Sequence, residues 1–130
     1  MRKGYRQLLE EAAAAVTTLE PAEAARLVAD EGALLVDLRD PREVERDGRI
    51  PGAKHCPRGM LEFWIDPESP YHKPYFSSGK PIVFYCASGW RSALAARTAG
   101  EMGLESLHLG GGLKAWREAG LPFEPGGPRP

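Results

Sequence analysis

Two short apolar runs, residues 33–36 and 81–85, constrain the fold of this chain most because neither contains a charged residue. A strand that faces water on one side alternates apolar and polar residues, whereas an unbroken apolar strand is covered on both faces and is typical of a parallel sheet. Further strands are predicted at 16–19, 54–56 and 106–109, with the first at an edge of the sheet. Helical spacing of apolar residues separates the strands, at residues 5–15, 21–30, 41–46, 92–102 and 113–119. This order predicts an α/β domain, a mostly parallel sheet with helices on both faces.

Length and composition exclude several classes of protein. The 130 residues suit one domain, for which we expect a helical extension at 1–15, a core at 16–123 and a flexible tail at 124–130. Seventeen basic residues balance 18 acidic ones, which argues against a nucleic-acid-binding protein. No apolar run approaches the roughly 20 residues that span a bilayer. The chain has only two cysteines and therefore no disulfide framework, so we expect a cytoplasmic protein. From the charge balance and the short apolar runs, we expect it to bind neither nucleic acid nor membrane.

Cys86 lies where parallel sheets bind their ligands, directly after a buried strand and before a helix. The small residues Ala87, Ser88 and Gly89 allow a tight turn whose backbone N–H groups point inward as an anion-binding nest. Arg91 adds a fixed charge and the following helix adds the positive end of its dipole. Together these groups favour the thiolate over the thiol, which suits nucleophilic attack on an anionic substrate. A buried core thiol is the alternative for Cys86, and a solvated cation the alternative for Arg91.

The candidate substrate-binding residues are the rest of this loop, Ala87, Ser88, Gly89, Trp90 and Arg91. Two reactions use such a loop, sulfur transfer and the hydrolysis of phosphate esters by a cysteine phosphatase. A phosphatase loop places five residues between its Cys and Arg, whereas here there are four. The tighter ring favours a single sulfur atom over a phosphate group.

Other residues are candidates for supporting roles. Asp37 follows a buried strand and either hydrogen-bonds the Cys86 loop or forms a structural pair with Arg39, which we favour. Arg58 either borders the mouth of the site or is a plain surface charge. Trp90 is expected to be partly exposed and to shield the sulfur from water.

The remaining chemical side chains have structural explanations. Cys56 is either a second thiol that reacts with Cys86 or, as we favour, a small buried residue. His55, Cys56, His72 and Cys86 lack zinc-ligand spacing, so no metal is expected. The aromatic residues between 61 and 80 form either a lid or docking patch, or a cluster packed on the core.

Four motifs in order resemble the rhodanese family of single-domain sulfurtransferases, over nearly all of residues 17–123. They are Leu35-Val36-Asp37-Leu38-Arg39 with Glu43, Ile50-Pro51-Gly52-Ala53, Cys86-Ala87-Ser88-Gly89-Trp90-Arg91-Ser92, and Leu109-Gly110-Gly111-Gly112-Leu113-Lys114-Ala115-Trp116 followed by Gly120-Leu121-Pro122. The chain departs from the family pattern at Arg49, where a histidine is common, in its long aromatic stretch 61–80, and in its N-terminal helix.

The resemblance implies a five-stranded parallel sheet and a Cys86 persulfide, with no metal or organic cofactor. The persulfide would take its sulfur from an anion such as thiosulfate and pass it to cyanide, a thiol or a sulfur-relay protein. Two alternatives remain open from the residues: a non-enzymatic binding module on the same fold, and a cysteine phosphatase or arsenate reductase.

Overall fold

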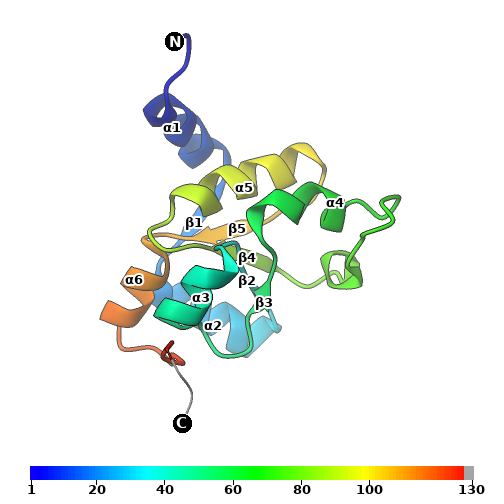
Figure 1. Cartoon of the computed structure of the whole chain (residues 1–130). Helices are drawn as coiled ribbons and strands as arrows, with labels where there is room; N and C mark the ends of the chain where they lie inside the picture. Colours follow the sequence, from blue (N-terminus) through cyan, green and yellow to red (C-terminus); the bar gives the residue numbers. More distant parts are fainter. Residues whose placement is uncertain (128–130) are drawn as a thin grey trace.

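A five-stranded sheet forms the centre of the molecule, in a computed structural model that describes residues 1–127 (Figure 1). The strands are β1 (Thr17–Leu19), β2 (Leu34–Asp37), β3 (Lys54–His55), β4 (Ile82–Tyr85) and β5 (Leu107–Leu109). They lie in the order β1-β5-β4-β2-β3, and all neighbouring pairs are parallel. The two apolar strands, β2 and β4, are central and adjacent, while β1 is at an edge as predicted.

Residues 1–127 also form six α-helices around the sheet. They are α1 (Tyr5–Ala15), α2 (Pro21–Glu31), α3 (Pro41–Asp47), α4 (Leu61–Ile65), α5 (Trp90–Glu101) and α6 (Gly112–Glu118), with 3₁₀ turns at Arg58–Met60 and Pro74–Ser77. Figure 1 shows α4 and α5 over one face of the sheet and α2, α3 and α6 over the other. The predicted α/β architecture is therefore confirmed. Helix α5 begins at Trp90, two residues earlier than the apolar spacing predicts, because Gly89 turns the chain at φ +103° and acts as its N-cap.

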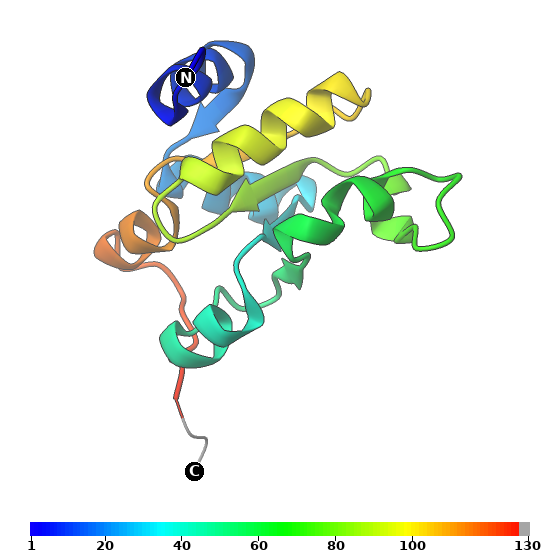
Figure 2. The same cartoon turned by 45° about the horizontal axis from the view of Figure 1, so that its top comes forward.

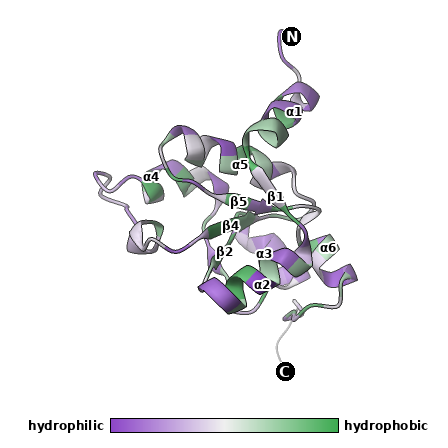
Figure 3. Ribbon diagram, turned by 180° about the vertical axis from the view of Figure 1, so that it is seen from behind, coloured by the Kyte–Doolittle hydropathy of each residue, from purple (hydrophilic) through white to green (hydrophobic). Residues whose placement is uncertain are grey.

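Each face of the sheet has its own apolar core. Along β4, Ile82 and Phe84 pack into the core under α4 and α5, whereas Val83 and Tyr85 pack into the core of α2 and α6. Figure 3 shows β4 in the hydrophobic colour between the two helix layers. An unbroken apolar strand was the sequence signal for this arrangement, and burial on both faces is its physical reason.

The aromatic stretch between β3 and β4 packs mainly on the core. Phe76 is a member of the core under α4 and α5, and Trp64 and Tyr75 pack against it. Tyr71 is exposed. The structure therefore favours the packed cluster over a lid for most of this stretch.

Both ends of the chain add contacts to the domain. Helix α1 packs against α5, beyond the edge strand β1 (Figure 2). Near the other end, Glu124 pairs with Arg49 in an antiparallel bridge, and the Gly127 N–H donates to the carbonyl of Glu45 at 2.7 Å. The last three residues of the predicted flexible tail, 128–130, lie outside the described residues. Within residues 1–127, no helix is both long enough and apolar enough to cross a bilayer.

Candidate active site

Cys86 lies at the carboxyl edge of the sheet, at the start of the loop that joins β4 to α5. The residue is 1% exposed. The Gly89 N–H donates a hydrogen bond to Cys86 Sγ at 3.2 Å, and the thiol lies 3.7 Å from Ser92 Oγ. The sulfur thus accepts a hydrogen bond from the loop backbone and, as a thiol, donates one to the Ser92 hydroxyl, which itself donates to the Gly89 carbonyl at 3.2 Å. The backbone N–H is a donor that stabilises a negatively charged sulfur.

Helix α6 orients the loop by binding its carbonyl groups. The Leu113 N–H donates to the Cys86 carbonyl at 2.9 Å, and the Lys114 N–H donates to the Ala87 carbonyl at 3.2 Å. Both carbonyls therefore point toward α6, and the Gly89 amide is left to face the sulfur. Because the carbonyl groups point away from the sulfur and an N–H group points toward it, the loop favours negative charge on the sulfur.

The three-glycine run before α6 allows this close contact. Gly112 has φ +59°, and a Cβ atom there would lie 2.5 Å from the Cys86 carbonyl oxygen. A side chain at this position would push α6 away from the loop and break the two hydrogen bonds. The glycine run is thus part of the structure of the site although it does not contact the sulfur.

Arg91 is held by an acidic partner that residue types alone did not reveal. Its Nη1 and Nη2 atoms donate to both carboxylate oxygens of Glu43, on α3, at 2.7 and 2.9 Å. The hydrogen bond from Arg91 lowers the pKa of Glu43, and the bond to Glu43 raises the pKa of Arg91, with a smaller contribution from the Cys86 sulfur. Glu43 is the anion that a basic residue at the start of a helix requires. The pair fixes the guanidinium beside the loop.

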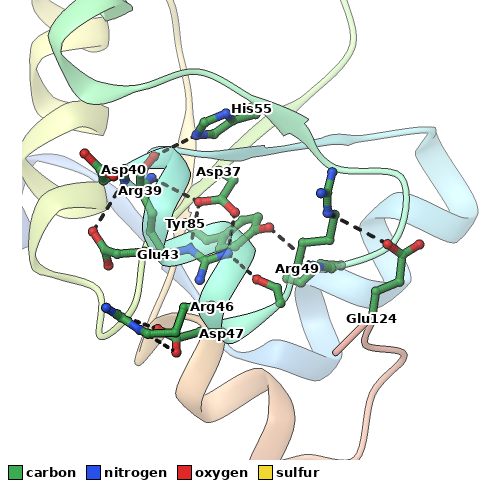
Figure 4. Close-up of polar contacts among 12 residues, drawn as sticks. Asp37, Arg39, Asp40, Glu43, Arg46, Asp47, Arg49, His55, Tyr85 and Glu124 are labelled. Atoms are coloured by element: carbon green, nitrogen blue, oxygen red, sulfur yellow. Dashed lines mark hydrogen bonds and ion pairs between the residues drawn. The ribbon is translucent and has the colours of Figure 1, made fainter. Parts of the chain in front are cut away.

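Asp37 and Arg39 form the structural pair that the sequence favoured (Figure 4). Asp37 accepts from Arg39 Nε at 2.9 Å and from Nη2 at 2.7 Å, and Nη2 also donates to the Gly48 carbonyl at 2.7 Å. Both residues are almost fully buried. The pair ties the end of β2 to the end of α3, and so supports the helix that carries Glu43.

The other candidates lie at the border of the site or outside it. Arg58 pairs with Glu62 one helical turn away, at 2.8 Å, as a partly exposed ion pair. Trp90 is 57% exposed, and its ring contacts Tyr5 of α1 with 5.4 Å between the ring centroids. Ala87 lines an open pocket of about 480 Å³, together with Arg39, Asp47, Leu113, Lys114, Arg117 and Glu118.

Cys56 is a core residue, as expected. It is completely buried under α4 and α5, and burial raises the pKa of its thiol to about 12. Among residues 1–127, no group of three or more His, Cys, Asp or Glu side chains is close enough to hold a metal ion.

The two thiols should differ in reactivity. Both residues are buried, but Cys86 lies in a loop at the edge of the sheet whereas Cys56 belongs to the core under α4 and α5. Because the pKa of Cys56 is raised to about 12, the Cys56 thiol also stays neutral near neutral pH. We expect iodoacetamide to modify Cys86 in the folded protein and both thiols after denaturation, as measured by peptide mass spectrometry. Modification of Cys56 at the same rate as Cys86 would contradict this expectation.

The sequence analysis did not single out one polar side chain that lies beside the loop. His108, in the middle of β5, is buried, and its Nδ1 atom lies 3.0 Å from Ser92 Oγ. The available signal was a polar histidine inside an otherwise apolar strand, Leu107–Leu109.

Comparison with known proteins agrees with this geometry. The model of the family described as "Rhodanese-like domain" matches residues 20–119. The chain belongs to the rhodanese-like domain family. A protein of Allochromatium vinosum named a sulfurtransferase is 35% identical over 99 residues, which cover 75% of this chain and 84% of that protein. At the level of the family, the comparisons therefore support a sulfurtransferase.

Two further relatives carry no established activity in their names. An uncharacterized protein of Synechocystis is 35% identical over 106 residues, 81% of this chain but only 54% of that protein. A solved structure from Rhodopseudomonas palustris is 54% identical with a TM-score of 0.90, covering 95% of this chain and 96% of that one. It is described as a protein of unknown function and a possible tyrosine phosphatase. The names of these rhodanese-like relatives thus point to two reactions, sulfur transfer and phosphate-ester hydrolysis, and the geometry of the site must distinguish them.

Proposed function

We propose that this rhodanese-like protein transfers a sulfur atom from an anionic donor, such as thiosulfate, to a thiophilic acceptor through a persulfide on Cys86. The observation that carries the proposal is the environment of the sulfur. Cys86 Sγ accepts a backbone hydrogen bond from Gly89, and the loop carbonyls are bound by α6. Such a fixed arrangement stabilises negative charge without reorganisation during the reaction.

The first step is attack of the Cys86 thiolate on the outer sulfur of the donor. With thiosulfate, the new bond joins Cys86 Sγ to that sulfur, the S–S bond of the donor breaks, and sulfite leaves with the bonding electron pair. In the second step, cyanide or a thiolate attacks the terminal sulfur of the persulfide. The bond to Cys86 Sγ breaks, and Cys86 returns to a thiolate.

Lys114 and Arg117 are the basic side chains beside the loop that an anionic donor can contact. They line the pocket beside Ala87 together with Asp47 and Glu118, whereas the Arg39 guanidinium there is buried and paired with Asp37. Arg91 lies next to the sulfur but is neutralised by Glu43, so its role is to position and polarise the loop rather than to supply a free charge. Trp90, which is exposed at the start of α5, does not line this pocket.

The spacing of Cys86 and Arg91 supports sulfur transfer over phosphate hydrolysis. Four residues separate them, and a phosphatase loop has five. The Arg91 guanidinium is also occupied by both oxygens of Glu43, which leaves fewer donors to bind a phosphate group.

An assay with two substrates tests the proposal. We expect the protein to form thiocyanate from thiosulfate and cyanide, and to leave an aryl phosphate unhydrolysed at the same protein concentration. Hydrolysis of the aryl phosphate as fast as sulfur transfer would contradict the proposal and favour a phosphatase. Absence of both activities would favour a binding module.

A further inference from the structure

A chain of polar side chains runs from the sulfur through the core to the edge of the sheet. Ser92 Oγ lies 3.7 Å from Cys86 Sγ and 3.0 Å from His108 Nδ1, and His108 Nε2 lies 2.9 Å from Thr18 Oγ1. The three partners come from α5, β5 and β1. Thr18 and His108 are aligned in the β1–β5 register, so their side chains share the face of the sheet covered by α5. Thr18 is exposed, and Ser92 and His108 are buried.

The Ser92 hydroxyl has a single proton and three acceptors nearby. These are the Cys86 sulfur, the Gly89 carbonyl at 3.2 Å, and His108 Nδ1 whenever this nitrogen lacks a proton. The shortest contact is with His108. If His108 carried its proton on Nε2, Nδ1 would take the Ser92 proton and the sulfur would lose a donor.

In the opposite tautomer the Ser92 proton has two acceptors left, the Gly89 carbonyl and the sulfur, and a thiolate is the stronger acceptor of the two because it is charged. With the proton on Nδ1, His108 donates to Ser92 Oγ, and Nε2 accepts from the Thr18 hydroxyl. Burial lowers the pKa of His108, so the ring remains neutral and has one donor and one acceptor. The charged groups that face the sulfur itself are Arg91 on α5 and, through it, Glu43 on α3.

We propose that His108 is a positioning residue, which Thr18 holds in the Nδ1–H tautomer so that Ser92 donates its hydroxyl proton to the Cys86 thiolate. This inference rests on the proposed function of Cys86 as the nucleophile. It extends the site by two residues that do not touch a substrate. These hydrogen bonds stabilise the Cys86 thiolate before it attacks the donor, and again when the acceptor takes the terminal sulfur and the thiolate leaves.

The direct readout is the rate of Cys86 alkylation by iodoacetamide as a function of pH. In His108→Leu, the ring no longer donates to Ser92, and we expect the midpoint of the profile to rise by roughly one to two pH units. His108→Asn keeps an amide donor near the position of Nδ1 and should recover part of the shift. In a Ser92→Ala background, His108→Leu should add no further shift, because His108 acts through Ser92.

Two exposed threonines provide a matched pair of controls that spares the core. Thr18→Val removes the hydroxyl that holds Nε2 and should raise the midpoint less than His108→Leu does, whereas Thr17→Val alters the neighbouring residue of β1 and should leave it unchanged. Equal profiles for Thr18→Val and wild type would overturn the proposal, even if His108→Leu does not fold. A shift from His108→Leu that persists in Ser92→Ala would also overturn it.

Sulfur-transfer kinetics give a second readout. A residue that positions the nucleophile should lower kcat for thiosulfate with little change in KM, and His108→Asn should restore part of kcat. Alkylation needs no sulfur donor, so it tests the hydrogen bonds from Thr18 through His108 and Ser92 to Cys86 even if the wild-type protein transfers no sulfur. Failure of the proposed function and failure of this inference are therefore distinguishable.

Discussion

Replacing Cys86 by serine is expected to reduce sulfur transfer from thiosulfate to cyanide to the rate measured without protein. Serine keeps the size of the side chain and a hydroxyl donor toward Ser92, but its oxygen is a weak nucleophile without a general base and forms no persulfide. Because Cys86 is packed in a small loop rather than in a large core contact, the variant should retain its fold. Thiocyanate formation, with circular dichroism of the same samples, measures both outcomes.

Cys56→Ala is the matched control for the loss of a buried thiol. Cys56 is completely buried under α4 and α5, away from the Cys86–Arg91 loop in sequence, so this variant should lose some stability but keep its turnover. Turnover that survives in Cys86→Ser, or disappears in Cys56→Ala while the protein stays folded, would contradict the assignment of Cys86.

Replacing Arg39 by methionine should lower the free energy of unfolding by about 3–5 kcal/mol, because Asp37 would remain buried as an uncompensated charge. In the wild type, Asp37 accepts two hydrogen bonds from the Arg39 side chain, and both side chains are at most 3% exposed. Chemical denaturation monitored by circular dichroism measures the loss. The double variant Asp37→Leu/Arg39→Met should be more stable than Arg39→Met alone, because it leaves no unpaired carboxylate.

Arg46 offers a control with nearly the same geometry at the surface. It pairs with Asp47 through two hydrogen bonds, at 3.0 and 2.8 Å, but both side chains are exposed (Figure 4). Arg46→Met should therefore lower the free energy of unfolding much less than Arg39→Met does, because solvent screens an exposed ion pair. If Arg39→Met and Arg46→Met lower the free energy of unfolding equally, burial does not increase the contribution of the Asp37–Arg39 pair to stability.

The sequence predicted the sheet well because its central strands have a strong local signal. Residues 33–36 and 81–85 are apolar without interruption, and such a run is stable only between two helix layers. The helix starts at Pro21 and Pro41 and the αL turn at Gly32 were likewise readable from local chemistry. Residues 61–65 form α4, which was not predicted because the apolar residues there do not follow a helical spacing and prolines lie nearby.

The residues of the site and their contacts could be predicted from the sequence only in part. Cys86 could be located because it follows a buried strand, and Asp37 and Arg39 pair across two residues of sequence. The partner of Arg91 is Glu43, 48 residues away, and the partners of His108 are Ser92 and Thr18 on two other elements. Such long-range pairs depend on the packing of α3 and α5 and on the register of β1, which residue spacing does not encode.

Cys86 is proposed to carry the transferred sulfur. The most direct measurement is the intact mass of the protein after incubation with thiosulfate, followed by peptide mapping. We predict a gain of the mass of one sulfur atom, located on the peptide that contains Cys86, absent in Cys86→Ser and removed when cyanide is added. A protein that gains no sulfur, or that gains it on Cys56 or in Cys86→Ser, would contradict the account.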